Sequence, residues 1–294
     1  MRCMRIYFFS ARRGEENTDV RQCIIMGHQR LGKLPASKKW REIVAYLADE
    51  NASVAELADR IVDACDGSLA KASKDPAFQQ ALHLLCLLPQ AARADNLQVG
   101  LAQIGVTVPD NPSRTDIIVG FEKAIEKAQR SNNHGVTDLS EMAKQAGIAA
   151  LNSILQQPAP APQLGFWDEP KSDTHRILDH SATPDGFGNL AQEFFVNLAS
   201  HNIKYFMHRE LPKHLGTEGA SPFVSDMSLF DRNVDKHCRE ASYIMRPFAR
   251  DWNANILYNK GTSIDKKALS GFAHVAMNKM RKEFKFRNAA DESN

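Results

Sequence analysis

Apolar residues that recur at steps of three and four are the feature that most constrains this chain. Within residues 183–255 they form two long stripes, which predict two amphipathic helices joined by a polar loop. The first stripe comprises Phe187, Leu190, Phe194, Leu198, Tyr205 and Leu211. The second comprises Leu229, Val234, Cys238, Ala241, Ile244 and Phe248. A chain made of such segments is expected to be an all-α protein.

Capping residues and prolines set the expected ends of these two helices. Thr183 is a good N-cap, and Pro184 fits the first helical position, where its missing N–H costs nothing. Pro212 is expected to end the first helix. Pro247 should kink or split the second, which is expected over residues 225–255, because it removes one backbone hydrogen bond and clashes one turn back.

Most of the remaining chain has the same helical spacing. Further helices are expected near residues 37–47, 53–69, 75–89, 95–104, 113–128, 137–155, 172–181 and 263–286. The basic arm of residues 1–35 is the exception. Its segments 5–10 and 23–26 suit either two short strands paired as a hairpin or loosely packed arms on a helical body.

Residues 156–163 alternate proline and alanine, which cannot continue a helix and prefer extended geometry. The segment predicts a boundary between two helical, bundle-like parts. Leu164, Phe166 and Trp167 follow it and are too apolar for a simple spacer, so we expect them to dock on a neighbouring domain or a partner protein. The expected organisation is an N-terminal arm (1–35), a helical domain (36–156), a linker and docking segment (157–171), a second helical domain (172–287) and a disordered tail (288–294).

Composition places this chain of 294 residues in the soluble class. Its 43% hydrophobic and 24% charged residues are ordinary values, and no apolar run approaches the roughly 18–20 residues that span a bilayer. No secretory signal pattern begins the chain. Five cysteines without a C-x-x-C pair suit a reducing compartment in which thiols are buried as small apolar groups. We therefore expect a cytoplasmic protein without a membrane partner.

The net charge of +2 conceals an uneven distribution. Residues 1–41 hold ten Lys and Arg against three acidic residues, and residues 264–287 hold seven against two. Such basic ends could bind nucleic acid or an acidic protein surface, although the solvated face of a helix has the same composition. The expected nucleic-acid contacts are Lys279, Arg281, Lys282, Lys285 and Arg287.

Histidines near the C-terminal helices are the candidates for metal chemistry. His237 and Glu240 lie three residues apart and share a helical face, and His208 and His214 could add ligands to a metal-dependent hydrolase site. However, residues six apart on one helix face different directions. Cys238 also points about 100° away from its neighbour His237, so the two do not form a thiol–imidazole pair.

Residues 27–34 nearly match the phosphate-binding loop G-x-x-x-x-G-K-[ST], but Leu34 replaces the hydroxyl residue that would hold magnesium. No strand with an acidic metal partner follows, which favours a chance match. The sequence contains no complete catalytic, metal or nucleotide motif. No cofactor is therefore expected, and the sequence favours binding over catalysis.

Residues 205–216 (YFMHRELPKHLG) and 237–242 (HCREAS) resemble the C-terminal region of uncharacterised helical proteins encoded in bacterial anti-phage defence operons. The resemblance covers about the last hundred residues and carries no catalytic residue. It implies an accessory subunit that works beside an ATPase or nuclease of the same operon. The leading hypothesis is thus a non-enzymatic adaptor or scaffold subunit, and the alternatives are a nucleic-acid-binding module and a metal-dependent hydrolase.

Overall fold

The computed structural model of this chain describes residues 75–131, 136–162, 171–214, 227–260 and 264–291. Over these residues the protein is all-α, as expected, with no β-strand. Its helices are α3 (Pro76–Ala91), α4 (Leu97–Gln103), α5 (Arg114–Ser131), α6 (Asp138–Leu155), α7 (Asp173–His180), α8 (Pro184–His214), α9 (Met227–Ala241), α10 (Met245–Lys260) and α11 (Lys266–Asp291). Three expected features lie outside the described residues: the N-terminal arm, the segment 27–34 that nearly matches the phosphate-binding loop, and the helices within residues 37–69.

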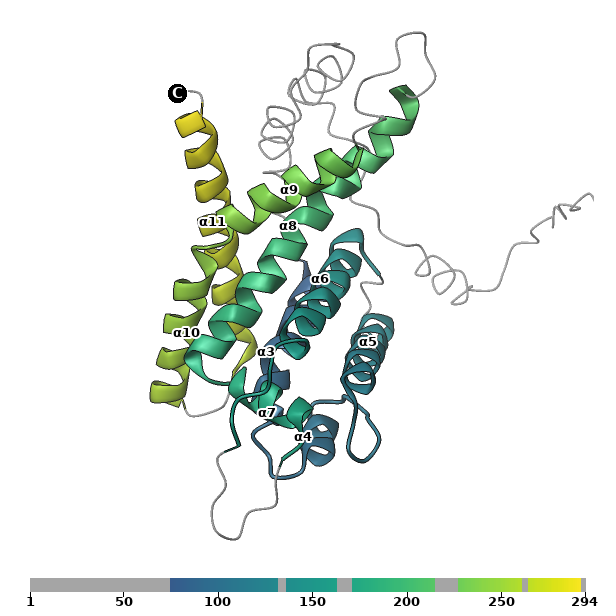
Figure 1. Ribbon diagram of the computed structural model, residues 1–294, viewed down its shortest axis with the longest axis vertical. Helices are drawn as coiled ribbons and strands as arrows, with labels where there is room; N and C mark the ends of the chain where they lie inside the picture. The colour runs from purple at the N-terminus through teal and green to yellow at the C-terminus, as the bar shows by residue number, and fades with distance from the viewer. Residues whose placement is uncertain (1–74, 132–135, 163–170, 215–226, 261–263, 292–294) are drawn as a thin grey trace, which may run out of the picture.

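Helix α8 is the longest described helix, runs along the length of the molecule and packs against α6, α9 and α10 (Figure 1). It contacts α6 along one side and α10 along the other, and α3 packs against α5, α6 and α11. Helix α5 therefore lies at one side of the molecule, while α10 and α11 lie at the opposite side. The largest fully buried side chains come from α3, α5, α8 and α11, and they are Phe78, Phe121, Phe187, Phe194, Phe195 and Phe272.

The helices on the two sides of the proline-rich linker share one hydrophobic core. Phe78 before the linker and Phe194 after it have ring centroids 6.2 Å apart. Tyr205 of α8 also donates a hydrogen bond of 2.7 Å to the buried Asp138 of α6. The expected domain limits stay a prediction, but the described helices that flank the linker do not have separate interiors.

The linker itself is partly held against the helices. The Arg176 Nε atom of α7 donates a hydrogen bond of 3.1 Å to the carbonyl oxygen of Pro160. Pro158 and Pro160 also line a small cavity together with Ile177 and Gly186. The beginning of this segment is therefore packed on α7 and α8, whereas Leu164, Phe166 and Trp167 lie outside the described residues.

Local sequence explains most helix ends. Thr137 caps α6, Ser172 caps α7, and Gly105 follows α4 with a φ of 84°, a conformation that favours glycine. The expected split near Pro247 is confirmed, because α9 ends at Ala241 and α10 begins at Met245. Pro247 thereby occupies the first turn of α10, where a helix needs no N–H from it.

Three expected helix ends are wrong by a few residues. Helix α3 continues past Pro89 to Ala91, and α8 continues past Pro212 to His214. A proline in the last turns removes only one backbone hydrogen bond, so the helix can continue through it. Helix α11 extends beyond residue 286 to Asp291, into the tail that we expected to be disordered. Among the described helices, none combines the length and apolar content that crossing a bilayer requires.

Candidate functional site

Helices α10 and α11 form a two-helix layer at one side of the molecule (Figure 1). Met245, Ala249 and Ile256 of α10 are buried at helical spacing. Gly188 of α8 permits the close approach of α10, since a Cβ atom at this position would lie 2.7 Å from the Arg246 carbonyl oxygen. The inward face of α10 is thus fixed against α8, and its opposite face is left to carry polar residues.

Helix α11 completes the layer through a cluster of aromatic rings. It begins after Asp265, whose carboxylate accepts a hydrogen bond of 2.6 Å from the Ala268 amide. Phe272 of α11 stacks on Phe248 of α10, with ring centroids 5.4 Å apart and an interplanar angle of 3°. Its centroid also lies 4.5 Å from that of Trp252. Phe272 is buried, but Phe248 and Trp252 are only half-buried, so the cluster reaches the surface.

Basic side chains lie on both helices of this layer, and one of them contacts the aromatic cluster. The Lys279 Nζ atom lies 5.3 Å from the centroid of the Phe248 ring, within the range of a cation–π interaction. Lys282 follows one turn later and is exposed, and Arg246 and Arg250 are exposed on α10. We refer to Arg246, Phe248, Arg250, Lys279, Arg281 and Lys282 as the α10–α11 surface.

The charge of this region has one predominant sign. Residues 245–291 contain ten Lys and Arg but four Asp and Glu. Two of the acids already have local partners, because Asp251 pairs with Arg250 at 3.0 Å and Asp265 accepts from the start of α11. The surface can therefore attract a polyanion and offer an aromatic edge to it.

Sequence reasoning found only half of this surface. Lys279, Arg281 and Lys282 were expected contacts, whereas Lys285 and Arg287 belong to α11 with side chains outside the described residues. Arg246 and Arg250 were missed. Part of their signal was available, because they are four residues apart on one helix.

Helices α8 and α9 meet in a seam of polar side chains. The Ser200 hydroxyl donates a hydrogen bond of 2.5 Å to Asp235, and Lys204 lies 2.9 Å from the same carboxylate. About one turn further along α9, Arg239 pairs with Glu193 at 2.8 Å. Residue numbers rise along α9 as they fall along α8, so the two helices are antiparallel. These contacts pair opposite charges and hold α9 in register on α8.

Two of the four expected metal ligands have side chains within the described part of the chain, so the expected metal site stays a prediction. His237 and Glu240 both lie on α9, half-buried, while His208 and His214 lie on α8 with side chains outside the described residues. The part of the chain that the structure describes contains no group of three or more His, Cys, Asp or Glu that could hold an ion. Cys238 is fully buried, and burial raises the pKa of its thiol well above the ordinary value. A buried, protonated thiol is a poor nucleophile.

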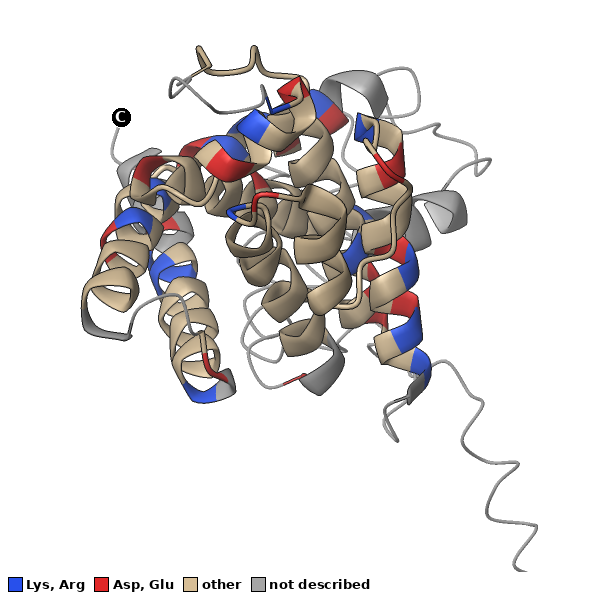
Figure 2. Cartoon of the chain, turned by 90° about the horizontal axis from the view of Figure 1, so that it is seen from below, with Lys and Arg blue, Asp and Glu red and all other residues tan. Residues whose placement is uncertain are grey.

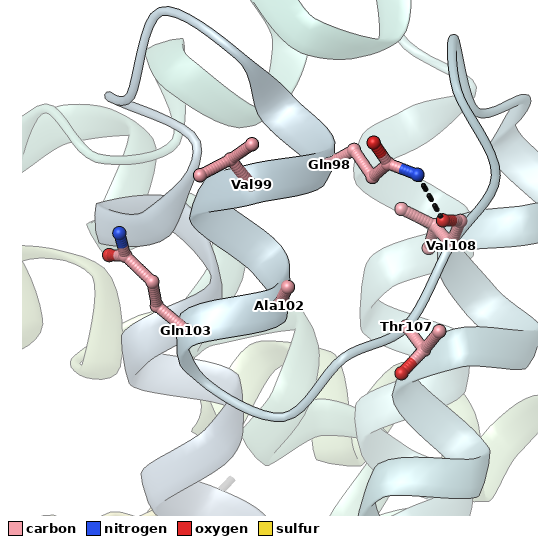
Figure 3. A pocket seen from close by; sticks show the side chains of 6 residues that line it. All are labelled: Gln98, Val99, Ala102, Gln103, Thr107 and Val108. Carbon is pink, nitrogen blue, oxygen red and sulfur yellow. Dashed lines mark hydrogen bonds between the residues drawn. The ribbon is translucent and has the colours of Figure 1, made fainter.

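A groove of about 440 Å³ lies between α4 and the segment that leads to α5 (Figure 3). Its lining residues carry no charge, and they are Gln98, Val99, Ala102, Gln103, Thr107 and Val108. Gln98 Nε2 donates a hydrogen bond of 3.2 Å to the Val108 carbonyl oxygen, which ties the two walls together. The groove offers apolar contact without an acid, base or nucleophile, so it suits binding rather than catalysis. Sequence reasoning gave no indication of it.

Comparisons of the chain with protein-family models, with curated proteins and with solved structures give no match. The function must therefore be inferred from the geometry of the chain itself, and the resemblance to defence-operon proteins stays an expectation.

Proposed function

We propose that this chain is a non-enzymatic binding protein that holds nucleic acid on the α10–α11 surface. The observation that carries the proposal is the excess of Lys and Arg on the two helices that also hold a partly exposed aromatic cluster. A solvated helix face usually holds both signs in similar numbers, as α5 does. Residues 245–291 hold ten basic residues against four acidic ones, and the basic side chains come from two helices that are fixed by close packing.

The expected chemistry is the attraction between phosphates and the Lys and Arg side chains of this surface. A protein that neutralises phosphates releases their condensed counterions, so its affinity falls steeply as salt is added. Lys282 is the exposed lysine nearest to the Lys279–Phe248 contact along α11 and is expected to contact a phosphate directly. Phe248 restrains Lys279, which lowers the conformational entropy lost when that lysine meets a phosphate.

Fluorescence anisotropy of a labelled oligonucleotide, titrated with the full chain over a series of salt concentrations, tests the proposal. We expect the logarithm of the association constant to fall linearly with the logarithm of the salt concentration. In the Lys282→Ala variant the slope of this line should be smaller in magnitude by about one. Lys127→Ala removes an exposed lysine from α5 and is the matched control, which should leave the slope unchanged. Binding that is undetectable, or that is insensitive to salt, would overturn the proposal.

A second candidate, an adaptor subunit of a bacterial defence complex, is favoured by the uncharged groove at α4. Val99 lines this groove and is 52% exposed, so its side chain is available for apolar contact with a partner. An apolar surface of this kind suits a protein partner. Co-purification of the full chain with the products of neighbouring genes tests this candidate. Loss of a co-purifying protein in Val99→Asp would support it, whereas a solitary monomer under all conditions would contradict it.

A further inference from the structure

Two exposed tyrosines lie near the two ends of α10. Tyr258 is 90% exposed, and Tyr243, two residues before the helix begins, is 57% exposed. They are the only exposed aromatic side chains among the described residues. The other aromatic residues of this helix, Phe248 and Trp252, pack on Phe272 instead. The two tyrosines therefore contribute little to the core, and their ring faces are open to a ligand.

Tyr258 belongs to the same exposed row as the arginines of the α10–α11 surface. Arg246, Arg250, Ala254 and Tyr258 follow one another at steps of four residues, and all four are exposed. Steps of four place successive residues on neighbouring positions of a helix surface. At a rise of 1.5 Å per residue, the row extends about 18 Å along the helix. Cationic groups thus occupy one half of the row and an open aromatic ring its end.

A surface that combines cations with an exposed aromatic ring is expected to bind single-stranded and duplex nucleic acid differently. In a duplex the faces of the bases are stacked on one another, so a protein meets phosphates and groove edges. In a single strand the bases can stack on aromatic side chains while the backbone follows a basic track. From this arrangement we infer that the exposed row of α10, which begins with two residues of the α10–α11 surface, binds single-stranded nucleic acid in preference to duplex, with a base stacked on Tyr258. The inference rests on the proposed function and adds the class of ligand.

The test compares labelled single-stranded oligo(dT) with a labelled duplex of equal length, both titrated with the full chain at one salt concentration. Wild-type protein is expected to bind the single strand more tightly. Tyr258→Ala should weaken single-strand binding by about tenfold, the effect of losing one stacked base. It should leave duplex binding and the salt dependence unchanged. Tyr258→Phe keeps the ring and should stay within about twofold of wild type on the same stacking argument.

Val119→Ala removes an exposed apolar side chain from α5 and is the control, which should bind both ligands as wild type does. Equal affinity for the two ligands, together with an equal effect of Tyr258→Ala on both, would overturn the single-strand inference and leave the proposed function intact. Failure of the wild-type chain to bind either ligand would remove both. Because Tyr258 is exposed, unchanged thermal unfolding of Tyr258→Ala confirms that any loss comes from the binding surface.

Discussion

Helix α5 and the α10–α11 pair lie on opposite sides of one core, and both sides carry basic and acidic residues (Figure 2), but in different proportions. On α5 the two signs are nearly balanced, and Glu126 pairs with both Arg130 and Lys144, at 3.1 and 3.4 Å. On the α10–α11 side, Lys and Arg predominate, and Lys279 lies against the ring of Phe248. The comparison shows that the number of charged residues on a helix says little about function. The arrangement of their signs, and what lies between them, is more informative.

The largest expected effect concerns whether the two sides form one unit. Phe272→Ala removes a buried ring from the α10–α11 side, and Phe121→Ala removes one from the α5 side. Each should lower the free energy of unfolding by about 3–5 kcal/mol, because a large cavity remains. Urea unfolding followed by circular dichroism should show one transition that shifts in both variants. Two separate transitions, each shifted by only one of the substitutions, would contradict the conclusion that the two sides share one core and unfold together.

The second largest effect is expected when charge is removed from the α10–α11 surface rather than from the surface of α5. Replacement of Lys279, Arg281 and Lys282 by Gln should weaken nucleic-acid binding on the order of a hundredfold. Each full phosphate contact contributes about tenfold at 0.1 M salt, and these three side chains differ in exposure. The matched variant carries Gln at Lys123, Lys127 and Arg130 of α5. Anisotropy titrations should place this control within about twofold of wild type, because its positive charges lie among acids.

A smaller effect is expected at the contact between α6 and α8. Tyr205→Phe removes the hydroxyl that donates to the buried Asp138 carboxylate. A hydrogen bond to a charged group contributes about 1.5–3 kcal/mol, and the lower part of this range is expected in chemical denaturation. Tyr258→Phe is the control, because an exposed hydroxyl should change stability by less than about 0.5 kcal/mol. An equal change in the free energy of unfolding in Tyr205→Phe and Tyr258→Phe would show that the Tyr205–Asp138 hydrogen bond does not stabilise the contact between α6 and α8.

The smallest effect is a dependence of stability on pH at the α8–α9 seam. Burial lowers the pKa of His201, the charge of Lys204 lowers it further, and Asp235 partly opposes both. The unfolded chain therefore takes up a proton before the folded one as the pH falls, and stability decreases as the pH falls below about 6.5. The free energy of unfolding of His201→Asn should decrease less than that of wild type between pH 7 and pH 5. If the free energy of unfolding decreased equally in wild type and His201→Asn over this range, His201 would not be the cause of the pH dependence.

Helical spacing predicted the all-α fold because each amphipathic stripe marks one helix face, and caps such as Thr183 marked where helices begin. Two features escaped this reasoning. Spacing within one helix does not say which other helix covers its stripe, so the core common to both sides of the linker was missed. The surface that includes Arg250 and Lys279 was missed for the same reason, because these residues are 29 positions apart in the sequence and belong to one layer only through the packing of α10 on α11.

Lysine reactivity tests most directly which surface binds. The full chain would be acetylated under limiting conditions with and without a single-stranded oligonucleotide, and the modified lysines quantified by mass spectrometry. We expect Lys279 and Lys282 to become protected on binding, while Lys123 and Lys127 of α5 react as before. Protection of the α5 lysines, with unchanged reactivity of Lys279 and Lys282, would contradict the assignment of the α10–α11 surface.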